Sequence, residues 1–292
     1  MKFMNLEIKY FLRVGLLMKK KQKVFMLAPF CLIWMLGFTF IKPLAFAESL
    51  KLINQRPCSP PPGPIGSIVM SFDYKDRMDE LKSSIKNGGN VNEIFCNNQS
   101  PLIFASRLPF AKYDPVVEIL ISNGANINHK DDMGYTALHF ASYVGRLKTV
   151  KLLAENGGEI NVQALDGVTP LNFTAYPEVI GYLLSKGADP NLADNKGNYP
   201  IHGLLRETQP IKMLLDRGAK INAQNNEGST ILHNVVKAIS VKESIFINNA
   251  KFLIENGADP YLKDKSGKTP LDYIEDNQIK TELTQFINSL PK

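Results

Sequence analysis

The sequence predicts an all-α solenoid of about seven helix-turn-helix units joined by short turns. Two separate markers recur in it: a residue that opens a repeated motif, and a glycine that follows an apolar stretch. The first falls at Ser100, Thr136, Thr169, Tyr199, Thr230 and Thr269, and the second at Gly88, Gly124, Gly157, Gly187, Gly218 and Gly257. Both series are spaced by 36, 33, 30, 31 and 39 residues, and two landmarks in one register indicate a true repeat. With 44% hydrophobic and 21% charged residues, the chain can bury a sizeable core.

Residues 1–47 are predicted to be a signal peptide. A basic segment follows Met18, the stretch Val24–Ile41 is uncharged and apolar, and residues 45–47 read Ala-Phe-Ala, the small-residue pattern of a cleavage site. Residues 1–17 are unusual ahead of such a basic segment, so Met18 is an alternative start. An uncleaved membrane anchor is the alternative function of this leader, because an apolar run of 18 residues reaches the lower limit for a spanning helix.

The net charge of +6 belongs to this leader. Eight of the 34 basic residues but only one of the 28 acidic residues lie within residues 1–47, so the rest of the chain has 26 basic and 27 acidic residues. This balance gives no electrostatic case for DNA or RNA binding. We expect no nucleic-acid partner, and no membrane contact once the leader has been cleaved.

Residues 48–66 are predicted to be an extended, semi-rigid spacer, because the proline-rich run Pro57–Pro64 fixes φ and lacks backbone donors. Of the three cysteines, Cys31 falls in the leader, which leaves Cys58 and Cys96. In an exported protein this pair can form one disulfide. Two free thiols are the alternative, because two positions form no pattern of spacing.

The repeat domain is predicted to span residues 67–292. Its units are 67–94, 95–130, 131–163, 164–193, 194–224, 225–263 and 264–292. A unit opens on Thr, a good N-cap, and Pro170 or Pro270 can follow at the first helical position. A second helix, which includes Thr149–Leu153, ends at a glycine, and a polar stretch such as Asn128–Gly134 turns into the next unit. One helix pair cannot bury its apolar face alone, so the units must stack.

The two end units are expected to cap the stack. The first lacks the motif, and the last ends in an amphipathic helix, Gln278–Leu290, whose apolar residues lie on one stripe. Between the two helices of a unit, the sequence is shortened in units four and five and lengthened in units two and six. We therefore expect a longer connection at Val241–Asn248.

The motif at Thr136–Ala141, TALHFA, resembles the T-P-L-H-x-A signature of the ankyrin repeat, whose period is 33 residues. Residues Gly187–Asn191 and Gly257–Pro260 are similar to the loop that follows the second helix in that family. The resemblance covers about residues 67–292 and implies an ankyrin-repeat solenoid. In this family the motif histidine hydrogen-bonds between repeats, which is the role expected of His139, His202 and His233.

The polar residues of the repeats do not form a catalytic pattern. One histidine per unit is a structural ladder and not a convergent ligand cluster. The turn aspartates, which satisfy backbone N–H groups, are Asp131, Asp132, Asp166, Asp194 and Asp264. No phosphate-binding glycine loop, nucleophile elbow or zinc motif occurs, and the repeats leave no room for a catalytic domain. We predict no enzyme activity, no catalytic or metal-binding residue, and no cofactor.

The expected function is therefore a protein-binding scaffold: an exported, bacterial-type ankyrin array, monomeric, and periplasmic or secreted. A solenoid offers a long concave surface of turn tips and first helices. Two alternatives are a secreted effector that engages a host protein and a periplasmic partner of a stress-defence enzyme, both by analogy with the family. The residues that the repeat framework does not dictate, and which we expect to bind the partner, are Met133, Tyr135, Tyr143, Leu165, Val168, Tyr176, Lys196, Asn198, Arg206 and Lys237.

Tyr143 and Tyr176 occupy the same position of neighbouring units, and Arg206 takes that position in unit five. Tyrosine and arginine are enriched where interfaces concentrate their binding energy. The alternative is that the two rings cover gaps left by the shortened connection of unit four.

Overall fold

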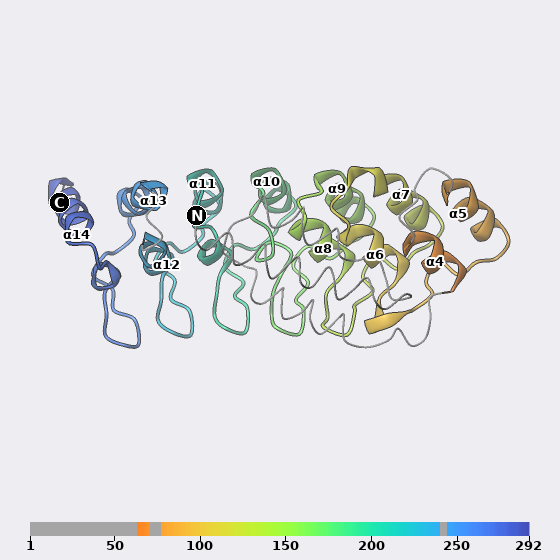
Figure 1. Cartoon of the computed structure of the whole chain (residues 1–292), viewed down its shortest axis with the longest axis horizontal. Helices are drawn as coiled ribbons and strands as arrows, with labels where there is room; N and C mark the ends of the chain where they lie inside the picture. The colour runs from red at the N-terminus through yellow and green to blue at the C-terminus, as the bar shows by residue number, and fades with distance from the viewer. Residues whose placement is uncertain (1–62, 71–76, 240–243, 292) are drawn as a thin grey trace, which may run out of the picture. The chain divides into compact units, whose positions relative to one another are not determined.

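Helical segments repeat along the chain in pairs, as the two markers predict (Figure 1). The computed structural model describes residues 63–70, 77–239 and 244–291; the predicted leader and residues 48–62 of the predicted spacer lie outside these ranges. The regular structure described is helical, apart from one isolated bridge between Phe95 and Gln99. Among the described helices, none has the length and apolar character needed to cross a membrane.

Four units contain two α-helices each. These pairs are α4 (Pro64–Met70) with α5 (Arg77–Lys86), α6 (Pro101–Arg107) with α7 (Asp114–Ser122), α8 (Ala137–Tyr143) with α9 (Leu147–Glu155), and α12 (Ile231–Ile239) with α13 (Ser244–Glu255). Unit two also has two short 3₁₀ segments, η1 (Cys96–Asn98) and η2 (Ala111–Tyr113). The predicted capping is present: Ser100 accepts a hydrogen bond from the Ile103 N–H at the start of α6, and Thr136 forms a capping box with His139.

The other three units differ from the prediction, because their first helix is a single turn. The turn comprises residues 170–173 in unit four, η3 (Pro200–Gly203) in unit five and η4 (Pro270–Tyr273) in unit seven. The second helices are α10 (Pro177–Ser185), α11 (Thr208–Leu215) and α14 (Asn277–Ser289). The second helix begins so soon after the motif residue that no second turn fits. The shortening expected between the helices of units four and five thus also shortens the first helix itself.

Two boundaries also move. Helix α4 begins at Pro64, inside the range predicted as spacer, and Ile65 is fully buried in the core. Proline is compatible with the first position of a helix, so the last proline of the run starts α4 instead of extending the spacer. Helix α13 begins at Ser244, so residues 244–248 belong to a helix and not to the longer connection expected at 241–248.

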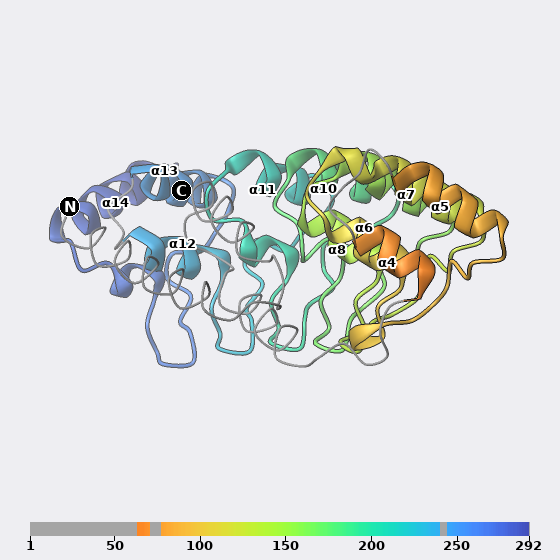
Figure 2. The same cartoon turned by 45° about the vertical axis from the view of Figure 1, so that its right-hand side comes forward.

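The segments form two rows (Figures 1 and 2). One row holds the first segments of the units, here called the inner segments, and the other holds the second helices, here called the outer helices; the turn tips project beyond the inner row. Helix α6 packs on α7 and α8, and α12 packs on α13 and η4. The motif's apolar residue is at most 2% exposed at Leu102, Leu138, Leu171, Ile201 and Leu232. The predicted stripe of α14 is present, with Leu283 fully buried and Ile279 and Phe286 packed on the core.

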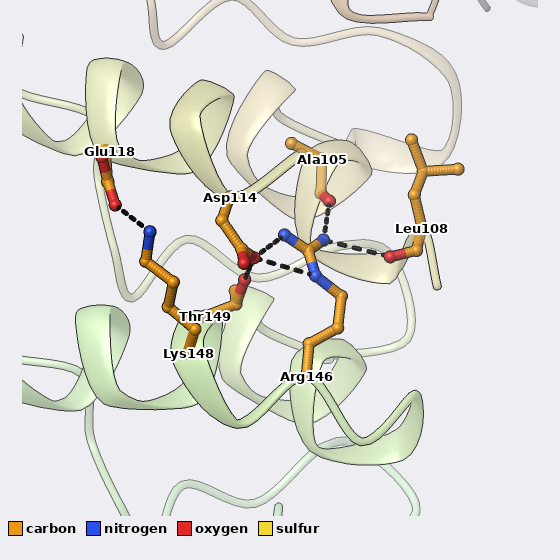
Figure 3. A network of polar contacts seen from close by, with 7 residues as sticks. All are labelled: Ala105, Leu108, Asp114, Glu118, Arg146, Lys148 and Thr149. Carbon is orange, nitrogen blue, oxygen red and sulfur yellow. Dashed lines mark hydrogen bonds and ion pairs between the residues drawn. The ribbon is translucent and has the colours of Figure 1, made fainter. Parts of the chain in front are cut away.

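A buried ion pair holds the longer connection of unit two against unit three (Figure 3). Arg146 lies at the start of α9 and pairs with Asp114 at the start of α7. Its Nη1 donates to the carbonyl oxygens of Ala105 and Leu108, at 2.7 and 3.0 Å, and the Thr149 hydroxyl donates to Asp114 Oδ1 at 2.7 Å. These partners satisfy both buried charges, so this site joins the two units structurally.

Candidate protein-binding surface

The turn tips share one backbone geometry. A tip is the five-residue turn that ends just before the motif residue, for example residues 131–135 in unit three. The N–H of its first residue donates to the carbonyl of its last, as from Asp131 to Tyr135 and from Asp194 to Asn198, both at 3.0 Å.

Where the first tip residue is Asp or Asn, its side chain also accepts backbone N–H groups: Asp194 Oδ1 accepts from Lys196 and Asn198, at 2.9 and 2.7 Å. Asp131, Asn225 and Asp264 do the same in their own tips. In unit four the first residue is Ala164, and Asp166 Oδ1 accepts from the Val168 N–H instead, at 3.2 Å. The predicted turn role is therefore confirmed for Asp131, Asp166, Asp194 and Asp264, and it stays a prediction for Asp132.

Successive tips are joined by single backbone hydrogen bonds. The Leu165 N–H donates to the Met133 carbonyl at 2.9 Å, and the Asn195 N–H donates to the backbone carbonyl of Asp166 at 2.8 Å. The tip glycine makes this approach possible. At Gly167 φ is +79°, and a Cβ would lie 2.7 Å from the Asn195 nitrogen, closer than any side chain allows. The tips are therefore held at fixed positions along the inner face, the name used here for the surface formed by the tips and the inner segments.

The motif histidines form the expected ladder between units. In each, Nδ1 accepts the N–H of the capping residue of its own unit, and Nε2 donates to a carbonyl of the next unit. The Nε2 acceptors of His139, His202 and His233 are Val168, Ser229 and Lys268, at 3.0, 3.0 and 3.2 Å. Burial lowers the pKa of all three, that of His139 to about 4. The rings are therefore neutral at neutral pH, and they make the hydrogen bonds between repeats that the resemblance implies.

In unit four Asn172 takes the place of the histidine. Its Oδ1 accepts from the Thr169 N–H at 3.0 Å, and its Nδ2 donates to the Asn198 carbonyl at 3.2 Å. An amide thus reproduces both bonds of an imidazole. The side chain is 6% exposed, so Asn172 belongs to the contact between units four and five.

A second ladder runs along the loops after the outer helices, and sequence reasoning missed it. In each rung an asparagine Nδ2 donates to the glycine carbonyl of the next unit, at 2.9 to 3.0 Å, and its Oδ1 accepts an N–H two residues beyond that glycine. The rungs are Asn92, Asn128, Asn161, Asn191 and Asn222. They keep the spacing 36, 33, 30 and 31, the same register as the two markers, so the signal was present in the sequence.

The predicted aromatic binding residues lie on the inner face but also pack on other residues of units three and four. The Tyr135 ring stacks on Phe173 with centroids 5.2 Å apart, and Tyr143 packs on the same ring at 4.7 Å. The Tyr135 hydroxyl donates to Asp166 at 2.5 Å. A Cβ on Gly145 would lie 2.6 Å from the Tyr176 ring, so that ring covers the end of α8. These contacts agree with the alternative that the rings fill space beside unit four, yet all three rings remain half-exposed.

Three other residues that were predicted to bind the partner are exposed to solvent. Met133 is 45% exposed and Leu165 is 70% exposed, and the hydrogen bond between their backbones places them at adjacent tips. Lys196 is exposed at the next tip.

The remaining four predicted residues make contacts between units. The Val168 carbonyl accepts from His139, and Asn198 Oδ1 accepts from Asn225 Nδ2 at 2.9 Å. The Arg206 guanidinium lies 5.7 Å from the Phe246 ring centroid. Lys237 donates to the Ser229 hydroxyl at 3.2 Å and lies 4.2 Å from the Tyr273 centroid. Each of these residues therefore also has a structural role.

Two further features concern possible chemistry. Among the described residues, no three His, Cys, Asp or Glu side chains converge in a way that could hold a metal ion. Cys96, at the tip of unit two, is disulfide-bonded, with its partner outside the described residues. The pairing with Cys58 stays a prediction.

Comparison with known proteins agrees with this architecture. A family model for three copies of the ankyrin repeat matches residues 69–164 and 102–194, and a model for many copies matches residues 214–274. Among solved structures, the crystal structure of the ankyrin repeat domain of Bcl-3, described as a unique member of the IkappaB protein family, is 24% identical. It aligns with a TM-score of 0.59 and covers 76% of this chain and 98% of that chain.

Proposed function

Because the chain belongs to the ankyrin repeat family, we propose that it is a non-enzymatic scaffold that binds a protein partner on its inner face. The observation that carries this proposal is the exposed apolar pair at adjacent tips, Met133 and Leu165. Neither side chain is needed by the tip geometry, which uses their backbone groups. Apolar side chains held out at fixed positions, beside the half-exposed Tyr135 and Tyr143, are typical of a protein-binding surface.

The experiment is affinity capture from the source organism with the full chain and two variants. Leu165→Asp places a charge in the apolar pair, and Tyr261→Asp is the matched control, because Tyr261 is 62% exposed in a loop that follows an outer helix. We expect a partner that the wild type and Tyr261→Asp retain and that Leu165→Asp loses. A partner retained equally by all three proteins contradicts binding at the tips.

We also propose that the protein is exported and acts as a monomer in the periplasm or after secretion. The leader pattern at residues 1–47 supports export, and so does the disulfide at Cys96, because such bonds persist in oxidising compartments. We expect the exported protein to begin at Glu48, as N-terminal sequencing would show. A full-length form in the membrane fraction would instead support an uncleaved anchor, and recovery of the protein inside host cells would support an effector.

A further inference from the structure

One row of residues on the inner face has a marked composition. The position seven residues after the motif residue is occupied in units two to six by Arg107, Tyr143, Tyr176, Arg206 and Lys237. All five side chains are half-buried. Burial lowers the pKa of Arg107 to about 10, which leaves its guanidinium charged at neutral pH. The row thus reads cation, aromatic, aromatic, cation, cation, with no acidic residue.

Two hydrogen bonds place this row beside the tips. Arg107 Nη1 donates to Gln99 Oε1 at 3.0 Å, and Lys237 donates to the hydroxyl of Ser229. Gln99 and Ser229 both stand immediately before the motif residue of their units, at the base of a tip. The residues immediately before the motif residues form a second row, which in units two to six also has no acidic residue. Unit seven has Lys268 at this position but Asp276 at the position of the first row, so the strip is limited to units two to six. The strip formed by the two rows is therefore basic at both ends and aromatic in the middle.

We propose that this strip binds an extended acidic segment of a partner protein, with two apolar side chains seated on Tyr143 and Tyr176. The inference rests on the proposed function and specifies its partner. The cations of the strip favour acidic side chains of the bound segment by charge complementarity. The two tyrosine rings offer a large, rigid surface on which apolar side chains of the segment can pack. A nucleic acid fits less well, because the middle of the row, Tyr143 and Tyr176, offers no cation to a continuous phosphate backbone, whereas a protein segment can place apolar side chains there.

The spacing of the units sets the spacing of the segment. Packed helices lie about 8–10 Å apart. A segment in the extended polyproline II conformation advances about 3.1 Å per residue with three residues per turn, so every third side chain points to the same face. Each unit therefore corresponds to about three residues of the bound segment. The expected pattern is an acidic residue, two apolar residues and two further acidic residues, each separated from the next by two others.

The test is fluorescence anisotropy with the full chain and a labelled synthetic peptide of about thirteen residues, the length that this spacing gives. The peptide has Glu at its first, tenth and thirteenth positions, Phe at its fourth and seventh, and Ser or Gly elsewhere; it is also made with Lys in place of Glu, and in reverse order. We expect the acidic peptide to bind in one of its two orders, more weakly as salt rises, and the Lys peptide not to bind. A labelled oligothymidylate is measured in parallel.

Charge-neutral variants make the test specific. Arg206→Gln combined with Lys237→Gln should weaken acidic-peptide binding about three- to tenfold. The matched control, Lys212→Gln with Lys220→Gln, changes two exposed lysines away from the strip and should leave affinity within about twofold. Circular dichroism of each variant verifies the fold.

Three results would overturn the inference: no binding of either acidic peptide, equal binding of the Lys peptide, or stronger binding of the oligonucleotide. Acidic-peptide affinity that is unchanged in the Arg206 and Lys237 variant would overturn it too. The proposed function fails by a different observation, namely a captured partner that Leu165→Asp still retains, so the two failures are distinguishable.

Discussion

Acidification is expected to weaken the stack through the histidine ladder, and His139 is the rung that allows this to be measured. Burial lowers its pKa from 6.5 to about 4. Between these values the unfolded chain binds a proton that the folded chain does not bind, so stability falls as pH drops from 6.5 to 4 and is fully present above 6.5. Protonation also removes the acceptor at Nδ1, which holds the Thr136 N–H at 3.1 Å.

The magnitude follows from the two pKa values. A folded pKa of about 4 against 6.5 in the unfolded chain implies a loss of about 2.5 kcal/mol between pH 7.5 and pH 4.5 from this one group. His202 and His233, whose pKa values burial also lowers, add losses of the same sign.

The matched variant is His139→Asn, because Asn172 makes the same two bonds in unit four. This variant should keep the rung but lose one titrating group. Its unfolding free energy should therefore fall less on acidification than that of the wild type, by about 2.5 kcal/mol. Urea unfolding followed by circular dichroism at pH 7.5 and pH 4.5 measures the difference, and carboxylate contributions cancel between the two proteins. Identical pH dependence in both proteins would refute the reasoning.

Two further predictions concern stacking. Gly167→Ala should cost at least about 2 kcal/mol of stability, because φ is positive there and the new Cβ would lie 2.7 Å from the Asn195 nitrogen. Gly267→Ala should cost only about 1 kcal/mol, because Gly267 has a similar φ but no neighbour within 4 Å. Equal losses of stability in thermal unfolding would contradict the role given to tip contacts. Arg146→Leu should cost about 3 to 5 kcal/mol because it leaves Asp114 buried without its cation, and the same variant with Asp114→Asn should recover part of this loss in denaturant titrations.

The sequence is sufficient to predict the repeat, its ladder of histidines and the turn role of the aspartates. These features are periodic, and a period is visible without knowing any distance. The Asn128 rung was equally periodic, but asparagine is common in turns, so its two bonds to the next unit were not separated from ordinary turn chemistry.

Features that occur once could not be predicted in this way. Arg146 and Asp114 are 32 residues apart, and no repeated spacing connects them. The single-turn first helices were missed because Thr and Pro specify where a helix starts, while its length depends on how soon the outer helix must begin. For the candidate site, the sequence indicates which positions of the repeat are not specified by the ankyrin motif. It does not show that Asn198 and Lys237 also join units, because the partners of these side chains lie about 30 residues away.

Unit seven shows which repeat positions depend on contact with a following unit. It has no following unit in this sequence, and three positions depart together. Asp272 replaces the motif histidine and keeps only the bond to the Thr269 N–H, at 2.9 Å; Tyr261 stands where each earlier loop has its asparagine rung; and Gly267 has open space around it. Residues that face a next unit are therefore constrained by that unit. By the same reasoning, side chains in the middle of the stack that no neighbour requires, Leu165 above all, are those that a partner protein can select.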